Sequence, residues 1–83
     1  MPDYRALYSI GAWVRTVPRA DLEAFARTWH SPHDFNPAQL TYADQVARVM
    51  QVPCYYAGDA LYECQGLPGL WHEACLRPAA PAA

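Results

Sequence analysis

The sequence predicts an α+β domain that is mainly β, and three observations support this prediction. Apolar and aromatic residues alternate through the last third of the chain, from Val46 to Leu76, which is typical of strands with one buried face. Two turn sequences, Gly58-Asp59 and Leu67-Pro68-Gly69-Leu70, divide this stretch into the three strands of an antiparallel meander. A further strand is predicted at Ala12 to Val17, and two helices are predicted after it, at about residues 19–44.

The length and composition indicate one small folded domain. The chain has 83 residues, a size at which a single hydrophobic core is only marginally sufficient. Its hydrophobic content of 53% and aromatic content of 13% are too high for a disordered chain. We expect one domain over residues 1–78 and a flexible Pro/Ala tail over residues 79–83. A homodimer is one way to bury the excess aromatic surface.

The charge pattern disfavours two classes of partner. The net charge is -2, and the six cationic residues are all arginines, spread singly along the chain. Nucleic acids bind clustered cations, so nucleic-acid binding is expected only if these arginines converge in the folded chain. No apolar run approaches the about 20 residues of a membrane span, and no secretion signal opens the sequence. We expect a cytoplasmic protein without membrane association.

The cysteine pattern favours a reducing compartment. Three cysteines are an odd number, so they do not form a closed disulfide framework. Cys54, Cys64 and Cys75 fall one on each strand of the meander, and we expect them to be small buried apolar side chains.

The first helix is predicted from about Arg19 to Trp29, after Pro18 ends the first strand. Its apolar residues fall at i, i+3, i+4 and i+7 and therefore share one face: Leu22, Phe25, Ala26 and Trp29. We expect this stripe to cover the open side of the strands. An exposed stripe would instead be a dimer or partner surface.

The second helix is predicted to begin at Asn36-Pro37-Ala38-Gln39, which supplies an N-cap, a proline at the first helical position and a capping glutamine. It either stops near Asp44 or continues to Met50. We place a strand from Val46, because the segment that follows is rich in β-formers. Pro53 has no backbone N–H, so this strand lies at an edge or carries a bulge there.

The two turns predict the strand register. With Gly58-Asp59 as a two-residue loop, Tyr56 is expected opposite Leu61. The second turn has the Pro-Gly pair of a type II turn and places Cys64 opposite Glu73.

Four segments resemble the strand pattern of a known family: Tyr8-Ser9-Ile10-Gly11-Ala12-Trp13-Val14-Arg15, Val46-Ala47-Arg48-Val49, Ala60-Leu61-Tyr62-Glu63-Cys64 and Gly69-Leu70-Trp71-His72-Glu73-Ala74-Cys75-Leu76. They resemble small bacterial SH3-like barrel domains, among them the C-terminal barrel of the nitrile hydratase β subunit. The resemblance implies an SH3-like barrel of four strands with a fifth short one, here with two helices inserted after the first strand. Nitrile hydration is not implied, because no matching metal-ligand motif occurs in this chain.

Histidine and cysteine spacing gives weak signals for a metal. His72 and Cys75 are three apart on a predicted strand, so they point to opposite faces and do not chelate one ion. His30 and His33 lie in a loop and can reach one ion, but two exposed loop histidines are the simpler interpretation. We expect no metal and no cofactor, and a metal-binding or enzyme-accessory subunit stays an alternative.

Catalysis by a cysteine is also weakly indicated. Cys64 opposite Glu73 is the one candidate nucleophile, yet His72 points to the other face of the strand and cannot serve as its base. We expect a buried, inert thiol and a protein that is not an enzyme.

Aromatic residues around the hairpin are the best candidates for a binding site. The predicted binding residues are Tyr55, Tyr56, Trp71, His72 and Glu73, together with His30 and His33 in the loop from His30 to Phe35. Trp71 with the tyrosines can form an aromatic groove for a peptide, with Glu73 as a polar anchor. The alternative interpretation is that Trp71 and Tyr62 fill the core and that Glu73 accepts hydrogen bonds from a turn.

These observations predict a non-enzymatic interaction module that binds another protein or itself. No phosphate-binding loop, carboxylate dyad, zinc spacing or catalytic triad pattern occurs in the sequence, whereas aromatic content is high and charge is low. The alternatives are an accessory protein of a phage or mobile element that inhibits a host protein, and a small barrel that binds nucleic acid.

Overall fold

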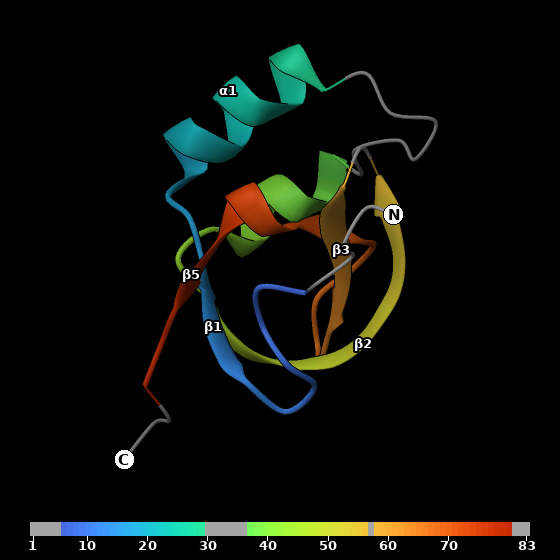
Figure 1. Ribbon diagram of the computed structural model, residues 1–83. Coiled ribbons are helices and arrows are strands. Elements are labelled where there is room, and N and C mark those ends of the chain that lie inside the picture. Colours follow the sequence, from blue (N-terminus) through green and yellow to red (C-terminus); the bar gives the residue numbers. More distant parts are fainter. Residues whose placement is uncertain (1–5, 30–36, 57, 81–83) are drawn as a thin grey trace.

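The structure is a computed structural model that describes residues 6–29, 37–56 and 58–80. The elements follow one another as β1 (Trp13–Thr16), α1 (Arg19–Thr28), the 3-10 helix η1 (Pro37–Tyr42), β2 (Val46–Tyr56), β3 (Asp59–Cys64), β4 (Trp71–His72), the 3-10 helix η2 (Glu73–Cys75) and β5 (Leu76–Pro78). The strands form a five-stranded antiparallel sheet in the order β4-β3-β2-β1-β5 (Figure 1). The predicted α+β, mainly β class is confirmed.

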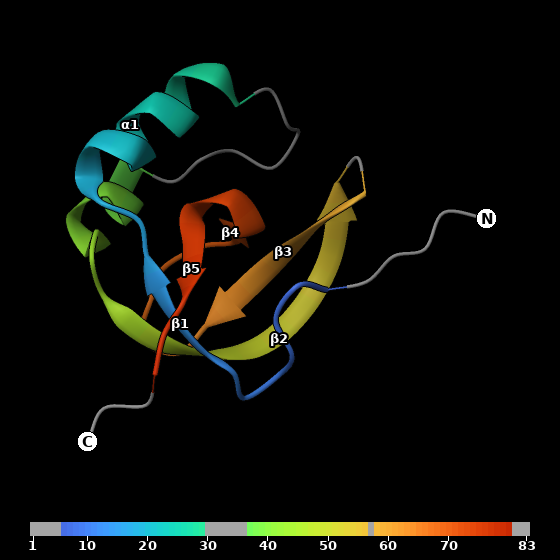
Figure 2. The same cartoon turned by 60° about the vertical axis from the view of Figure 1, so that its left-hand side comes forward.

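The long strand β2 joins the two halves of the sheet. Its first residues, Val46 to Arg48, pair with β1, and the remainder pairs with β3. Figure 2 shows how strongly β2 curves between these two partners. The register shifts between Gln51 and Cys54, on either side of Pro53, so the bulge predicted from this proline is confirmed. The strand also begins at Val46, as predicted.

The predicted register of the first hairpin is wrong by two residues. Tyr56 pairs with Asp59 rather than with Leu61, so Asp59 belongs to β3 and not to the turn. Gly58 has a φ of 89°, which a glycine adopts without strain, and the chain therefore reverses one residue earlier than expected.

The second turn is longer than predicted, and the third strand of the meander is shorter. Gly66 and Gly69 both have positive φ, so the chain bends twice before Tyr62 pairs with Trp71. β4 then ends after two residues, because the imidazole of His72 accepts the amide N–H of Ala74 and starts η2. Cys64 is consequently not opposite Glu73.

The last strand leaves the meander altogether. β5 pairs antiparallel with β1, with Arg15 opposite Arg77 and Thr16 opposite Leu76. Ala79 extends this pairing, since its N–H donates to the carbonyl of Trp13 at 3.1 Å. The tail predicted over residues 79–83 continues beyond the described residues.

In its described residues, 19–29 and 37–44, the helical insertion contains one α-helix and one 3-10 helix instead of two α-helices. α1 forms as predicted and buries Leu22, with Phe25 packed at the edge of the core. The second segment is the six-residue 3-10 helix η1. An α-helix is costly to nucleate and gains stability with each added residue, so a segment of this length gains little from being α-helical. Gln39 is buried there and donates to the carbonyl of Leu70 at 2.8 Å. Within the described residues, no helix is both long and apolar enough to cross a bilayer.

The core lies between the concave side of the sheet and the segments that cover it. Its largest members are Trp71 and Tyr62, both without exposed surface, which confirms the interpretation that they fill the core. Tyr8 covers them from the N-terminal segment: its N–H donates to the Tyr62 hydroxyl at 3.0 Å, and its own hydroxyl donates to the carbonyl of Leu76 at 3.2 Å.

All three cysteines carry free thiols. Cys64 and Cys75 are buried as expected, although Cys75 lies in η2 rather than on a strand. Cys54, also expected to be buried, is only partly buried. Burial raises the pKa of Cys64 to about 11 and that of Cys75 to about 12. Both thiols are therefore protonated near neutral pH, and Cys64 does not have the activated thiolate of a nucleophile.

Candidate functional site

The structure brings together three of the seven predicted site residues: Tyr56, His72 and Glu73. Trp71 has no exposed surface, and its indole Nε1 donates to the carbonyl of Pro68 at 3.0 Å, so it supports the site from within the core. Tyr55 packs against the core. His30 and His33 lie outside the described residues.

Four partly exposed rings meet where α1 covers the hairpin, and we call them the aromatic cluster: Phe25, Trp29, Tyr56 and His72. Phe25 stacks on Trp29 with ring centroids 4.9 Å apart. The centroid of the His72 ring lies 5.2 Å from those of both rings, and Trp29 and Tyr56 form a T-shaped pair with centroids 5.4 Å apart. The helical stripe therefore covers the strands, as predicted, and also supplies two members of the site that the sequence did not assign to it.

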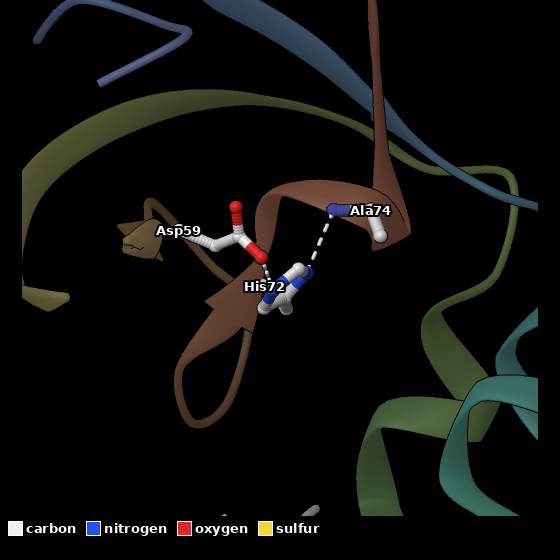
Figure 3. A network of polar contacts seen from close by, with 3 residues as sticks. All are labelled: Asp59, His72 and Ala74. Atoms are coloured by element: carbon white, nitrogen blue, oxygen red, sulfur yellow. Dashed lines mark hydrogen bonds and ion pairs between the residues drawn. The ribbon is translucent and has the colours of Figure 1, made fainter. Parts of the chain in front are cut away.

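The hydrogen bonds of His72 assign an acceptor and a donor role to its two ring nitrogens in this geometry (Figure 3). Its Nδ1 accepts the backbone N–H of Ala74 at 2.9 Å, and a backbone amide can only donate. Nδ1 therefore carries the lone pair, and the proton is on Nε2, which donates to Oδ2 of Asp59 at 3.2 Å. His72 therefore links η2 to the first residue of β3.

Asp59 connects His72 to a second carboxyl group. The pKa of Glu73 is raised, first by burial and then by a hydrogen bond to Asp59 and the negative charge of that residue. The electrostatic interaction with His72 and a hydrogen bond from the backbone N–H of Ala60 oppose this rise in pKa. Two carboxyl groups thus share one small site, and Glu73 binds a proton more readily than a free glutamate does. Sequence reasoning missed Asp59 because it assigned this residue to the turn.

The raised pKa of Glu73 predicts a pH-dependent stability. A carboxyl group with a raised pKa in the folded state stabilises the fold fully below its ordinary value of 4.5, and this contribution is lost as pH rises through the folded-state value. The quantity to compare is the difference in free energy of unfolding, wild type minus Glu73→Gln. We expect this difference to fall as pH rises above 4.5. Urea unfolding of both proteins across this range measures the difference. A difference that stays constant or grows with pH would contradict the prediction.

Glu73 also lines a groove. It has a volume of about 460 Å³ and is lined by Leu7, Tyr8, Glu73, Leu76, Arg77 and Pro78. Leu7 is 66% exposed, so the N-terminal segment contributes an accessible apolar wall. Glu73 supplies a carboxyl group and Arg77 a permanent positive charge. The groove can hold an apolar segment and also provides polar contacts of both signs.

The described part of the chain contains no cluster of three or more histidine, cysteine or acidic side chains arranged to hold a metal ion. Searches with family models, curated protein sequences and solved structures find no match to this chain.

Proposed function

We propose that this chain is a non-enzymatic protein-interaction module with an SH3-like barrel fold, and that it binds an extended segment of another protein across Glu73. One observation carries the proposal: Glu73 in η2 directly follows His72 of the aromatic cluster and also lines the groove. A partner segment that crosses Glu73 would contact partly exposed rings on one side and an apolar hollow on the other.

The connection between the two edge strands supports barrel closure. In a flat sheet of five strands, β4 and β5 would be about 19 Å apart, at about 4.8 Å per strand. Only Glu73–Cys75 connects them, and a 3-10 helix rises about 2.0 Å per residue. The sheet must therefore curl to bring its edges near each other, which agrees with the curve of β2 in Figures 1 and 2.

The chemistry of the site favours a particular kind of segment. Aromatic rings bind extended and proline-rich segments well, because such segments lose little conformational entropy on binding. Asp59 and Glu73 together add negative charge beside the rings. We therefore propose an extended apolar or proline-rich partner segment that carries an arginine or a lysine to meet these carboxyl groups.

Selection from a random peptide library with the immobilised, tag-free protein tests the proposal. Enriched peptides are expected to contain apolar residues or prolines next to a basic residue. Their affinity should fall at least about tenfold in the double variant Tyr56→Ser/Glu73→Gln, a loss typical of residues at the centre of an interface.

Arg48→Gln is the matched control, because Arg48 belongs neither to the aromatic cluster nor to the groove. It should leave the peptide affinity unchanged. Light scattering on the same proteins measures the mass in solution, and a dimer that dissociates in the double variant would identify a second copy of this chain as the partner. No enriched peptide from a monomeric protein would contradict the proposal.

A further inference from the structure

Three of the six arginines of the chain converge on one face of the sheet. Arg15 and Arg77 are direct cross-strand partners, so their side chains leave the sheet on the same side. Trp13 is two residues before Arg15 on β1 and is the direct partner of Arg48 on β2. We call these four residues the arginine face. Its arginines are spread over 63 positions of sequence, from 15 to 77, which is why the sequence shows no cluster.

The charges of the arginine face are not neutralised within the described part of the chain. The guanidinium of Arg15 donates to the backbone carbonyl of Asp44 at 3.2 Å, and that of Arg48 donates to the carbonyl of Gly11 at 3.3 Å. Among the described residues, Arg19 pairs with Glu23 and His72 bonds Asp59, and none of the three face arginines takes part in these contacts. Like charges directly opposite each other on neighbouring strands repel, so Arg15 and Arg77 together favour a bound anion.

Trp13 gives this face a planar aromatic surface beside the charges. The guanidinium carbon of Arg48 lies 5.3 Å from the centre of the Trp13 ring, in cation–π contact. Gly11, whose carbonyl accepts from Arg48, has a φ of 89°, a backbone conformation that favours glycine. Val46 and Met50, which flank Arg48 on β2, are 37% and 46% exposed. Charged, aromatic and apolar groups therefore alternate on an open strand surface.

We propose that the arginine face binds single-stranded nucleic acid. A single strand offers phosphates to forked guanidinium groups and base faces to an indole, in regular alternation along its length. An acidic peptide would bind the three arginines but would not need the Trp13 ring. A lipid headgroup would not need aromatic and charged groups that alternate along the strands. The inference goes beyond the proposed protein-binding function, and of these four residues only Arg77 also lines the groove.

Salt dependence of oligonucleotide binding tests this inference. The probe is fluorescent oligo(dT) of about 12 nucleotides, which falls within the usual site sizes of small single-strand-binding domains. With three phosphate contacts, the plot of log K against log salt concentration should have a slope of about -2, at about -0.7 per contact. Arg15→Gln and Arg48→Gln should each reduce the magnitude of this slope by about 0.7.

Two further variants test base stacking on Trp13 and the effect of a positive charge outside the arginine face. Trp13→Leu should weaken binding about tenfold while the slope stays the same, because the indole stacks on a base and contacts no phosphate. Arg19→Gln removes an equal charge from α1, where Arg19 pairs with Glu23, and should leave binding unchanged. Far-UV circular dichroism verifies that each variant is folded.

Three results would overturn the inference. The first is no oligonucleotide binding at low salt. The second is a slope that Arg15→Gln and Arg48→Gln leave unaltered. The third is equally tight binding of a polyglutamate peptide or of phosphatidylserine vesicles, which would identify a surface for anions of another class.

Discussion

Trp71→Ala is expected to lower the free energy of unfolding by about 3–5 kcal/mol, the usual cost of truncating a fully buried aromatic residue. Trp71 has no exposed surface and is the largest side chain in the core. The substitution removes the contacts of the indole and leaves a cavity behind it. A domain of this size has a stability of only about 4–12 kcal/mol, so the variant is expected to be partly or wholly unfolded at physiological temperature.

Trp71→Phe is a milder variant whose free energy of unfolding can be measured if Trp71→Ala does not fold. Phenylalanine retains most of the apolar volume but loses the hydrogen bond from Nε1 to the carbonyl of Pro68. We expect a loss of about 1–3 kcal/mol in urea unfolding, because that carbonyl loses its partner. Trp29→Ala is the matched control, since Trp29 is partly exposed and should cost clearly less than Trp71→Ala. Equal losses for the two tryptophans would contradict the described core.

Leu22→Ala is expected to cost about 2–5 kcal/mol and to loosen α1 from the rest of the domain. Leu22 is the one fully buried residue of this helix. α1 also contacts η1 and η2, but its remaining apolar residues are not fully buried. An isolated helix of 10 residues is marginal in water, so loss of this anchor should reduce helicity as well as stability.

Urea unfolding and far-UV circular dichroism measure the two effects of Leu22→Ala together. Leu22→Met is the control, because it conserves volume and should cost less than about 1.5 kcal/mol. The aromatic cluster supplies a second readout, since loosening of α1 separates Trp29 from His72 and changes the indole fluorescence. Unchanged helicity and a loss below about 1 kcal/mol would show that Leu22 does not anchor the helix.

Local patterns in the sequence predict most of the fold. The alternation after Val46, the stripe on α1 and the missing N–H of Pro53 each act through neighbouring residues, and each prediction is confirmed. The predicted register is wrong because it depends on turn geometry. Two glycines with positive φ, Gly58 and Gly66, shift both turns, and a shift of the turn shifts every pair that follows.

The end of the meander depends on a side chain that the strand pattern does not reveal. Residues from Trp71 to Leu76 continue the alternation of a strand, yet His72 bonds the N–H of Ala74 and converts the next residues into η2. This single hydrogen bond ends β4, places Glu73 beside Asp59 and frees β5 to pair with β1. The predicted second helix is the six-residue 3-10 helix η1, and its predicted N-cap, Asn36, lies outside the described residues.

The candidate site was only partly visible in the sequence. Tyr56, His72 and Glu73 were predicted from the hairpin, whereas Trp29 and Asp59 join them through tertiary contacts. The arginine face was invisible for the same reason, because β5 returns to β1 only after η2. Convergence of distant segments requires the strand order, and local periodicity does not supply it.

The most direct test of the proposed function is to map where a selected peptide binds. Titration of isotope-labelled protein with that peptide, followed by amide and indole NMR signals, reports every contacted residue. The proposal predicts shifts at Trp29, Tyr56, His72 and Glu73, with signals of Arg15 and Arg48 unchanged. Shifts confined to the arginine face, or no saturable shifts at the aromatic cluster, would contradict it.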